Sequence, residues 1–343
     1  MLRPETEADL AQMIIGAEDP LEVRGGGTRA VGDIRGEVLD TRGLGGVRLY
    51  EPGAMTLVVG AGMALADVEA LLASEGQRLA FEPSGIAGST IGGVVAVNAS
   101  GPRRVQAGAC RDSLIGVRFV DGTGAIIKNG GRVMKNVTGY DLVKLMAGSW
   151  GTLGVLTELS FRVLAIPPAV ATVVVPCDAA RAPAILAQAL GSPFDVSGAA
   201  WVNGRALVRV EGLAASVDYR ARQLCGILGG TVEAFDWAQV RDVATLDGEG
   251  DLWQFSLRPS EAAAVAARLN APLMMDWGGG RITVRLPKGV DARALAAPYT
   301  GHAMRLSMGV GAFEPEAAAV KSLTDSLRKR FDPRGILNAG RLI

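Results

Sequence analysis

Histidine and cysteine are scarce in this chain of 343 residues. The single histidine, His302, rules out a pair of histidines that would bind a divalent metal ion, and we expect no metal site. The three cysteines, Cys110, Cys177 and Cys225, are widely spaced and form no CxxC metal motif. Their odd number and wide spacing fit a reducing compartment.

An excess of charge of one sign is also lacking. Lys and Arg number 35 together, as do Asp and Glu, and aromatic residues make up only 5% of the chain. The sequence therefore has neither the basic field nor the stacking platforms that nucleic-acid binding needs. No apolar run approaches the roughly 20 residues of a membrane-spanning helix. The first residues, MLRPETEADL, are acidic where a signal peptide would be basic. We expect a cytoplasmic protein without a transmembrane segment.

Glycine, in contrast, is abundant. The chain has 46 glycines among its 343 residues, or about 13%, whereas an average composition contains about 7% glycine. Hydrophobic residues amount to 49%, which is enough for the cores of two domains. The excess of glycine therefore calls for a local explanation, which the chain gives in three segments.

The first part of the chain predicts an α+β domain over residues 1–168. Thr6 and Asp9 form a capping-box pattern that opens a helix reaching about Ala17. Short apolar runs and turn signals then predict the remaining elements. The expected strands cover residues 21–24, 37–40, 47–50, 56–59, 117–120, 125–128 and 156–163, with a helix over 64–73.

The second part, residues 169–307, repeats one order of elements twice. Strand, helix, two strands, helix and strand follow one another in each copy, which is typical of a split βαβ, or ferredoxin-like, unit. Two such units would form one antiparallel sheet with helices on one face and the other face free to cover something. The tail, residues 308–343, holds an amphipathic helix over 314–330 and a turn-rich return to the first domain.

The three glycine-bearing segments carry the chemistry. Residues 24–28, RGGGT, leave a strand, and consecutive residues without a Cβ can present main-chain N–H groups to an anion. A plain tight turn is the alternative. Residues 82–101 are rich in small residues and suit a backbone wrapped against a flat polar ligand. Residues 135–155 join a helix-like piece to a glycine-spaced turn before a strand.

In this order the three segments resemble the FAD-binding domain of the vanillyl-alcohol-oxidase/PCMH flavoprotein superfamily. The string KNVTGYDLVKLMAGSWGTLGVLTE, residues 135–158, is similar to that of glycolate oxidase and D-lactate dehydrogenase subunits. The ending FDPRGILNAGRL, residues 331–342, is similar to the usual C-terminus of that family. The chain most resembles the FAD-binding subunits of bacterial glycolate oxidase. The resemblance implies a two-domain PCMH-type FAD-binding fold with a ferredoxin-like antiparallel-sheet cap domain.

The resemblance also implies which residues hold a non-covalent FAD. The first segment would bind the pyrophosphate, the second would lie along the cofactor, and the third would approach the flavin through backbone groups. Asn338, in the returning tail, would contact the flavin edge. The expected FAD-binding residues are Arg24, Gly25, Gly26, Gly27, Thr28, Pro83, Ser84, Gly85, Gly88, Ser89, Thr90, Gly92, Gly93, Asn98, Ser100, Gly101, Gly151, Thr152, Val155 and Asn338.

The sequence departs from its relatives at several positions. Trp150 stands where they have an acidic residue, so side-chain bonding to the flavin is not carried over at that point. Thr28 excludes a histidyl-flavin bond at the first segment. The residues around Cys110 do not match the bicovalent pattern, and a buried, idle thiol is the favoured interpretation.

A rival cofactor motif follows the strand at residues 56–59. Gly60-Ala61-Gly62 before a helix imitates the Rossmann βαβ turn that binds NAD. Its sixth position is Leu65, where close packing of helix on strand requires a small residue. We therefore favour a structural turn here and keep NAD binding as the alternative.

Other polar residues have mostly structural interpretations. His302 is expected to be a structural imidazole, with a position facing the flavin as the alternative. Tyr140 and Asp141 are expected to anchor a turn, with a proton relay as the alternative. Arg111 and Asp112 are expected to brace the domain. One arginine of the second domain could clamp a substrate carboxylate, the candidates being Arg205, Arg209, Arg258, Arg281, Arg285 and Arg305.

The function expected is that of an FAD-binding flavoprotein subunit in a multi-subunit oxidase of glycolate, a small 2-hydroxy acid. It would pass electrons toward an iron–sulfur subunit and a quinone, alongside a His-bearing catalytic flavoprotein subunit. Attachment to the inner membrane would then come through partners. Three alternatives remain: a stand-alone FAD-dependent alcohol or sugar-acid oxidase, an FAD-holding assembly or electron-relay subunit without its own turnover, and a cofactor-free structural paralogue, which the retained glycine segments disfavour. No catalytic residue is assigned from the sequence.

Overall fold

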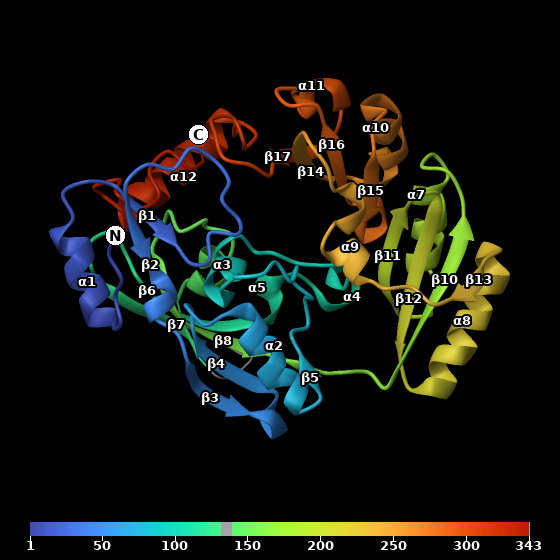
Figure 1. Cartoon of the computed structure of the whole chain (residues 1–343), viewed down its shortest axis with the longest axis horizontal. Helices are drawn as coiled ribbons and strands as arrows, with labels where there is room; N and C mark the ends of the chain where they lie inside the picture. The colour runs from blue at the N-terminus through green and yellow to red at the C-terminus, as the bar shows by residue number, and fades with distance from the viewer. Residues whose placement is uncertain (132–138, 343) are drawn as a thin grey trace. The chain divides into compact units, whose positions relative to one another are not determined.

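The computed structural model describes residues 1–131 and 139–342 (Figure 1). It divides into two compact units. The first comprises Met1–Ala99, Ala109–Ala165 and Met308–Ile343, and the second comprises Ser100–Gly108 and Ile166–Ser307. Residues 100–108, which the sequence analysis assigned to the FAD-binding domain, thus belong to the second unit.

The first unit opens with the predicted capping box. Helix α1 (Glu7–Gly16) begins after Thr6, whose hydroxyl accepts a hydrogen bond from the Asp9 N–H at 3.1 Å. The Asp9 carboxylate accepts in return from the Thr6 N–H at 3.1 Å. Both donors would otherwise lack a partner at the helix start, so the local sequence fixes where α1 begins.

The core of this unit is a five-stranded antiparallel sheet. Its order is β3 (Val47–Glu51), β4 (Thr56–Gly60), β8 (Val155–Arg162), β6 (Leu114–Val120) and β7 (Ile126–Gly130). Helices pack the apolar side of the sheet around fully buried Phe81, Phe119 and Phe161. The other helices and short strands of the unit are α2 (Leu65–Ser74), β5 (Gln77–Arg78), α3 (Ile91–Ala96), α5 (Cys110–Ser113), α6 (Leu142–Met146), β9 (Leu164–Ala165) and α12 (Ala318–Phe331).

A separate parallel pair carries the first glycine segment. Strand β1 (Leu21–Arg24) pairs with β2 (Glu37–Asp40), and Leu21 also bridges to Leu337 of the tail. The buried side chains of Leu10, Leu21 and Leu39 pack with those of Ile336 and Leu337 in a small core of their own. The C-terminal return is therefore part of the scaffold from which residues 24–28 emerge.

The Rossmann alternative is wrong. Strand β4 pairs antiparallel with both β3 and β8, whereas a βαβ unit requires parallel strands. Gly60 and Gly62 have a packing role instead, because a Cβ at either position would lie 2.2 Å from a main-chain oxygen, that of Leu44 and of Thr41 respectively. This turn is structural.

One helix lies inside the segment that was expected to be a wrapped loop. Thr90 caps α3 by accepting a hydrogen bond from the Gly93 N–H at 3.2 Å. Gly92 and Gly93 lie in the first turn of α3, and glycine disfavours a helix by about 1 kcal/mol per residue. Tertiary packing overrides that preference, since Ile91, Val94 and Val95 are fully buried.

The second unit is built on one eight-stranded antiparallel sheet, as predicted. Its order is β13-β10-β12-β11-β15-β16-β14-β17, so each ferredoxin-like half places its four strands in the same relative order and the halves meet at β11 and β15. The strands are β10 (Ala169–Pro176), β11 (Val196–Val202), β12 (Arg205–Gly212), β13 (Thr231–Glu233), β14 (Asp251–Leu257), β15 (Leu273–Asp276), β16 (Arg281–Leu286) and β17 (Gly301–Arg305).

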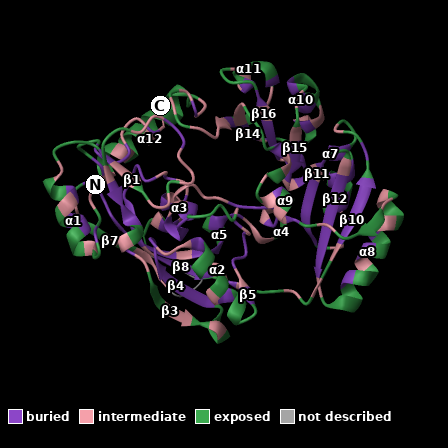
Figure 2. Cartoon of the chain, in the orientation of Figure 1, coloured by how far each residue is buried: buried purple, intermediate pink, exposed green. Residues whose placement is uncertain are grey.

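Helices cover one face of this sheet. They are α7 (Ala182–Leu190), α8 (Ala214–Leu228), α10 (Ala262–Leu269) and α11 (Ala292–Ala296). Alternate strand residues such as Val173, Val208 and Phe255 are fully buried beneath them. Figure 2 shows the consequence: β10, β11 and β12 are largely buried, and α8 is exposed on its outward side.

The opposite face is not left free. Part of it is covered by the segment that contains α9 (Ala238–Arg241), where Trp237 and Val240 pack on Val174 and Leu207. Another part contacts α4 (Arg104–Ala107), which lies against β11. The expectation of a wholly open face is therefore corrected.

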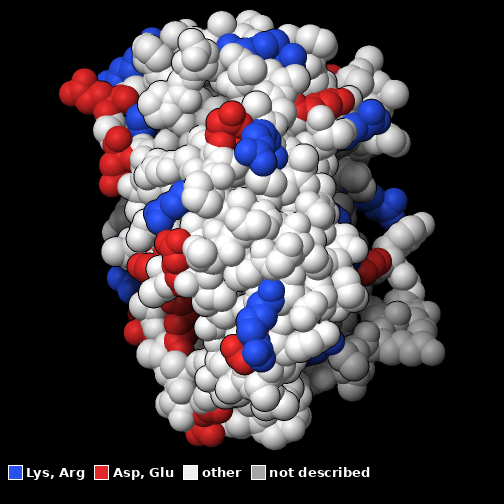
Figure 3. Space-filling model, turned by 90° about the vertical axis from the view of Figure 1, so that its right-hand side faces the viewer, with Lys and Arg blue, Asp and Glu red and all other residues white. Residues whose placement is uncertain are grey.

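Charge and hydropathy agree with the balanced composition. On the face drawn in Figure 3, basic and acidic side chains are interspersed and form no large patch of one sign. Within the described ranges, no helix combines the length and the apolar character needed to cross a membrane.

Candidate functional site

The first unit contains a cavity where the glycine segments converge. Its empty volume is about 740 Å³, part of which is open to solvent. Ten of the predicted FAD-binding residues line it. They are Arg24, Gly25, Gly26, Gly27, Thr28, Thr90, Gly92, Gly93, Gly151 and Asn338.

The loop after β1 offers main-chain donors to this cavity. Within the described residues, the N–H groups of Gly25, Gly26, Gly27 and Thr28 donate to no acceptor of the chain. Gly27 has a φ of 69°, a left-handed conformation that residues with a Cβ seldom adopt. A run of unpartnered N–H groups with such a turn is the arrangement that binds phosphate oxygens.

Two of these glycines are also needed because the second glycine-bearing segment lies against them. A Cβ on Gly25 would lie 2.2 Å from the Thr90 hydroxyl oxygen, and one on Gly26 would lie 1.7 Å from the Gly88 carbonyl oxygen. Gly26 thus approaches the backbone of the neighbouring loop, and Gly25 approaches the Thr90 side chain. These glycines were predicted to leave space for a ligand, and in the structure they also leave space for the neighbouring loop.

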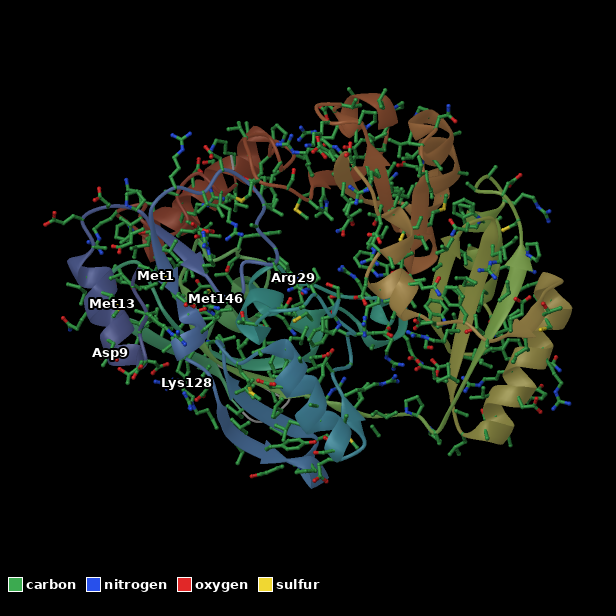
Figure 4. The ribbon with its side chains drawn as sticks, viewed as in Figure 1. Met1, Asp9, Met13, Arg29, Lys128 and Met146 are labelled. Atoms are coloured by element: carbon green, nitrogen blue, oxygen red, sulfur yellow. The ribbon has the colours of Figure 1, made fainter. Side chains whose placement is uncertain are left out.

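Arg29, labelled in Figure 4, fastens the same two loops together. Its guanidinium donates to the Ser89 hydroxyl at 2.8 Å, and to both the carbonyl and the hydroxyl of Ser84 at 3.0 Å. The hydroxyls of Thr28 and Ser89 are 2.9 Å apart. Ser84 and Ser89 therefore stabilise the loop that lines the cavity without lining it themselves.

The third segment reaches the cavity at Trp150 and Gly151. Both have left-handed φ values, 57° and 70°, and the Trp150 N–H donates to the Ala96 carbonyl at 2.8 Å. Thr152 lies just behind, with its hydroxyl donating to the Ser149 carbonyl at 2.7 Å. Val155 is fully buried in the small core around α1 and lines no part of the cavity.

Asn338 joins the tail to two walls of the cavity. Its side-chain nitrogen donates to the Trp150 carbonyl at 2.7 Å, and the residue is 2% exposed. A Cβ on Gly151 would lie 2.7 Å from that nitrogen, so glycine is needed there. Asn338 has the same left-handed backbone, with a φ of 48°. Because its side-chain bonds go to the chain itself, its main role here is to position the segments.

Arg341 is a lining residue that was not predicted from the sequence. It lines the cavity and is 8% exposed, and its guanidinium lies 5.3 Å from the Trp150 ring. Burial lowers the pKa of Arg341 to about 10, and the charge of Glu22 opposes that shift. The only sequence signal was its place three residues after Asn338 in the NAGR string.

Several predicted residues do not line this cavity. Ser100 and Gly101 belong to the second unit, where their carbonyls accept hydrogen bonds from Arg281 at 3.1 Å and from the Trp277 indole at 3.0 Å. Asn98 accepts from the Arg111 N–H at 3.0 Å. The others outside the lining are Pro83, Ser84, Gly85, Gly88, Ser89, Thr152 and Val155. Their part in FAD binding stays a prediction.

The arginines of the second unit are mostly occupied within it. Arg209 donates to the Ser197 hydroxyl at 3.2 Å and lies 3.7 Å from the Glu211 carboxylate. Arg281 donates to Asp276 at 2.7 Å, and Arg285 donates to the Gly250 carbonyl at 3.2 Å. Arg205 lies 3.9 Å from Glu233. A substrate clamp from these arginines would have to break existing contacts.

His302 does not behave as expected. It is exposed on the edge strand β17, and within the described residues its imidazole has no hydrogen-bond partner. The structural-imidazole interpretation is therefore wrong. No cluster of three or more potential metal ligands occurs in residues 1–131 and 139–342.

Two other expectations hold. Cys110 is fully buried, and burial raises the pKa of its thiol, as suits an unreactive residue. Asp141 anchors a turn by accepting from the Lys144 N–H at 3.1 Å, whereas Tyr140 is exposed. Residues 135–138 of the third segment lie outside the described residues.

The cavity suits a bound dinucleotide. Unpartnered main-chain donors line it beside Ala61, Ala96 and Leu156, whose apolar side chains suit an aromatic ring system. One carboxylate, Glu22, and three arginines, Arg24, Arg29 and Arg341, belong to its lining. This balance favours an anionic ligand over a cationic one.

Comparison with known sequences agrees with this chemistry. A family profile described as "FAD binding domain" matches residues 1–130. The chain is 35% identical over 334 residues to glycolate oxidase subunit GlcE of Escherichia coli K12, covering 96% of this chain and 94% of that protein. It is 34% identical over 152 residues to glycolate oxidase subunit GlcD of Bacillus subtilis 168, covering 43% of this chain and 32% of that protein.

Comparison with solved structures supports the fold. An alkyldihydroxyacetonephosphate synthase superposes with a TM-score of 0.73 at 17% identity, covering 98% of this chain and 76% of the other. At that identity the likeness concerns architecture alone. The superposition covers residues of both units.

Proposed function

The chain belongs to the family of FAD-binding glycolate oxidase subunits, and from this membership we propose that it holds FAD in the cavity beside residues 24–28 as one subunit of a multi-subunit oxidase of glycolate. The observation that carries the proposal is the run of main-chain N–H groups at Gly25–Thr28 without acceptors in the described chain. Such a run costs free energy unless a ligand or water supplies the acceptors.

The chain's own residues would divide the work of binding. The N–H groups of Gly25–Thr28 would donate to the diphosphate, and Arg29 would keep their loop in place through Ser84 and Ser89. Asn338 would hold Trp150 and Gly151 at the opposite wall. FAD, when bound, supplies the capacity to accept and release electrons. We propose that the bond to the protein is non-covalent, because Thr28 replaces histidine at the first segment and Cys110 is buried.

Within that role, an FAD-holding assembly or electron-relay subunit is the variant that the structure favours. Turnover of a 2-hydroxy acid needs a carboxylate clamp and a base for the hydroxyl proton. Arg209 and Arg281 are buried and engaged with Glu211 and Asp276, and the single histidine, His302, is exposed on an edge strand. These positions offer no preformed clamp or base.

We propose partners on the same basis. The name of the Escherichia coli relative describes it as a subunit, and a relative of part of this chain is named as another subunit, GlcD. A His-bearing flavoprotein subunit would supply substrate oxidation, and an iron–sulfur subunit would receive electrons destined for a quinone. A cytoplasmic location, with membrane attachment through such partners, fits this assembly.

A visible absorption spectrum of the pure protein tests FAD binding, and a yellow flavin band is expected. The protein is then mixed anaerobically with glycolate, first alone and then with its partner subunits. Bleaching only with partners supports the relay role. Rapid bleaching of the lone chain contradicts that role, and peroxide formation by the lone chain in air indicates a stand-alone oxidase. A colourless protein that stays colourless with excess FAD refutes the proposal itself.

A further inference from the structure

Arg341 is a buried cation in the cavity wall whose partners carry no negative charge. Its side chain donates to the main-chain carbonyls of Arg29 at 3.1 Å and, weakly, of Trp150 at 3.5 Å. Its Nε is buried and has no hydrogen-bond partner within the described residues. The residue is 8% exposed, so water does not solvate the charge well.

Glu22, the one carboxylate in the described lining of the cavity, pairs with a different arginine. Glu22 binds Arg24 through both of its oxygens at 2.7 Å. Within the described residues, Arg341 has no carboxylate within the 4 Å that defines an ion pair. Arg29, a second arginine in the lining, donates hydrogen bonds to the hydroxyls of Ser84 and Ser89 and to the Ser84 carbonyl. The positive charge of Arg341 therefore has no counter-charge from the described lining of this wall.

The burial of Arg341 has a measurable consequence. Desolvation lowers its pKa to about 10, which means that the cationic form is disfavoured relative to water. A neutral hydrogen-bond donor could also bind the carbonyl oxygens of Arg29 and Trp150. These two contacts therefore do not explain why a positively charged side chain occupies this position. An anion that enters the cavity would compensate the charge and use the free Nε donor.

The position of Arg341 indicates which part of a ligand it meets. It touches the Arg29 carbonyl, which directly follows the four N–H groups of Gly25–Thr28 in the chain. Its other contact, Trp150, belongs to the wall that Asn338 secures. The cation and the N–H run thus lie in one lining, and both suit phosphate oxygens.

We infer that Arg341 binds a phosphate oxygen of the dinucleotide diphosphate, in concert with the N–H groups of Gly25–Thr28, and that this inference rests on the proposed function. Arg341 would then be a cofactor-binding residue supplied by the C-terminal tail. Binding of the diphosphate would also fix the tail, because Arg341 and Asn338 belong to the same turn.

The test uses flavin-free protein and three probes: FAD, ADP and riboflavin. ADP carries the diphosphate without the flavin, and riboflavin carries the flavin without the diphosphate. Arg341→Met removes the charge at similar length, and Arg341→Lys keeps the charge without the planar fork. Arg35→Met, at an exposed arginine paired with Asp33, is the matched control. Dissociation constants are measured by calorimetry, and folding is checked by circular dichroism.

We expect Arg341→Met to weaken ADP and FAD about tenfold or more and to leave riboflavin within about twofold. Arg341→Lys should fall between wild type and Arg341→Met, and it serves as the test if the methionine variant does not fold. Unchanged ADP affinity in either folded variant overturns the inference. Weakened riboflavin with unchanged ADP also overturns it, since the cation would then face the flavin. Failure of the wild type to bind FAD at all refutes the proposed function instead.

Discussion

The side-chain oxygen of Asn338 accepts a hydrogen bond from the Val23 N–H at 2.8 Å, although 315 positions separate the two residues. The same side chain donates to Trp150, so one buried amide ties the tail both to β1 and to the third glycine segment. This relationship explains why a polar residue with a left-handed backbone occupies the buried C-terminal turn.

Replacement of Asn338 by alanine should therefore destabilise the protein. It leaves the Val23 N–H without an acceptor and the Trp150 carbonyl with one donor fewer, at a cost of about 1–3 kcal/mol. The midpoint of thermal unfolding of the flavin-free protein should fall by several degrees. Ser322→Ala, at an exposed position of α12, should leave the midpoint unchanged. Equal midpoints for the two variants would contradict the positioning role of Asn338.

Gly26→Ala should disrupt the cofactor loop. The added Cβ would lie 1.7 Å from the Gly88 carbonyl oxygen, so the two loops must separate. We expect little flavin in the purified variant and FAD affinity reduced about tenfold or more. Gly53→Ala is the matched control, because an added Cβ there meets no heavy atom within 4 Å. Flavin fluorescence titration compares the two, and wild-type affinity in Gly26→Ala would refute the close approach.

The Arg281–Asp276 pair should be costly to break. Both residues are buried, their charged groups are 2.7 Å apart, and Arg281→Met would leave the Asp276 carboxylate without its cation. The expected loss of unfolding free energy is about 3–5 kcal/mol, measured by urea denaturation. The exposed pair of Arg222 and Asp218 is the comparison, and Arg222→Met should cost less than about 1 kcal/mol. The double variant Arg281→Met with Asp276→Leu should recover much of the loss.

Glu7 should give the stability a pH dependence on the acidic side. The Arg118 side chain donates to Glu7 at 2.9 Å and lowers the pKa of its carboxyl below the usual range, with a further hydrogen bond from Thr157. A depressed carboxyl pKa adds stability above the unfolded-state value of about 4.3, and this stability is lost as the pH falls through the folded-state pKa. Wild type should therefore exceed Glu7→Gln in urea midpoint by a constant margin from pH 6 to 8.

That margin should shrink once the pH drops below about 4.3. Midpoints measured at intervals down to pH 3 follow the change. Asp67→Asn, at an exposed residue near the start of α2, is the control and should track wild type more closely. A margin that stays constant to pH 3 would show that the Arg118 contact does not depress the Glu7 pKa.

Much of the architecture could be predicted because it depends on local pattern. The capping box at Thr6 and Asp9 fixes the start of α1, and alternating apolar residues give the strands of both ferredoxin-like halves. The short helix α3 could not be predicted in this way, because its two glycines oppose a helix and only the burial of Ile91, Val94 and Val95 favours it.

The part of the site that is formed by main-chain groups could be predicted from the sequence. The glycine runs include Gly25, Gly26 and Gly92, where an added Cβ would collide with a neighbouring segment, and such runs are visible in a single sequence. Arg341 was not visible, because its importance arises from long-range burial beside Trp150 and Arg29. The placement of Ser100 and Gly101 with the second unit likewise depends on contacts with Trp277 and Arg281, 176 and 181 positions away in the chain.

The membership of residues 100–108 in the second unit affects any attempt to divide this protein. A continuous fragment of residues 166–307 would carry the eight-stranded sheet and lack the piece that contacts Trp277, Arg281 and Glu211. If only residues 166–307 were exchanged into a related protein, Trp277 and Arg281 would lose the carbonyl acceptors of residues 100–101, and Glu211 would lose its ion pair with Arg103. An exchange of the second unit must therefore move residues 100–108 together with residues 166–307, so this unit cannot be transferred as one continuous stretch.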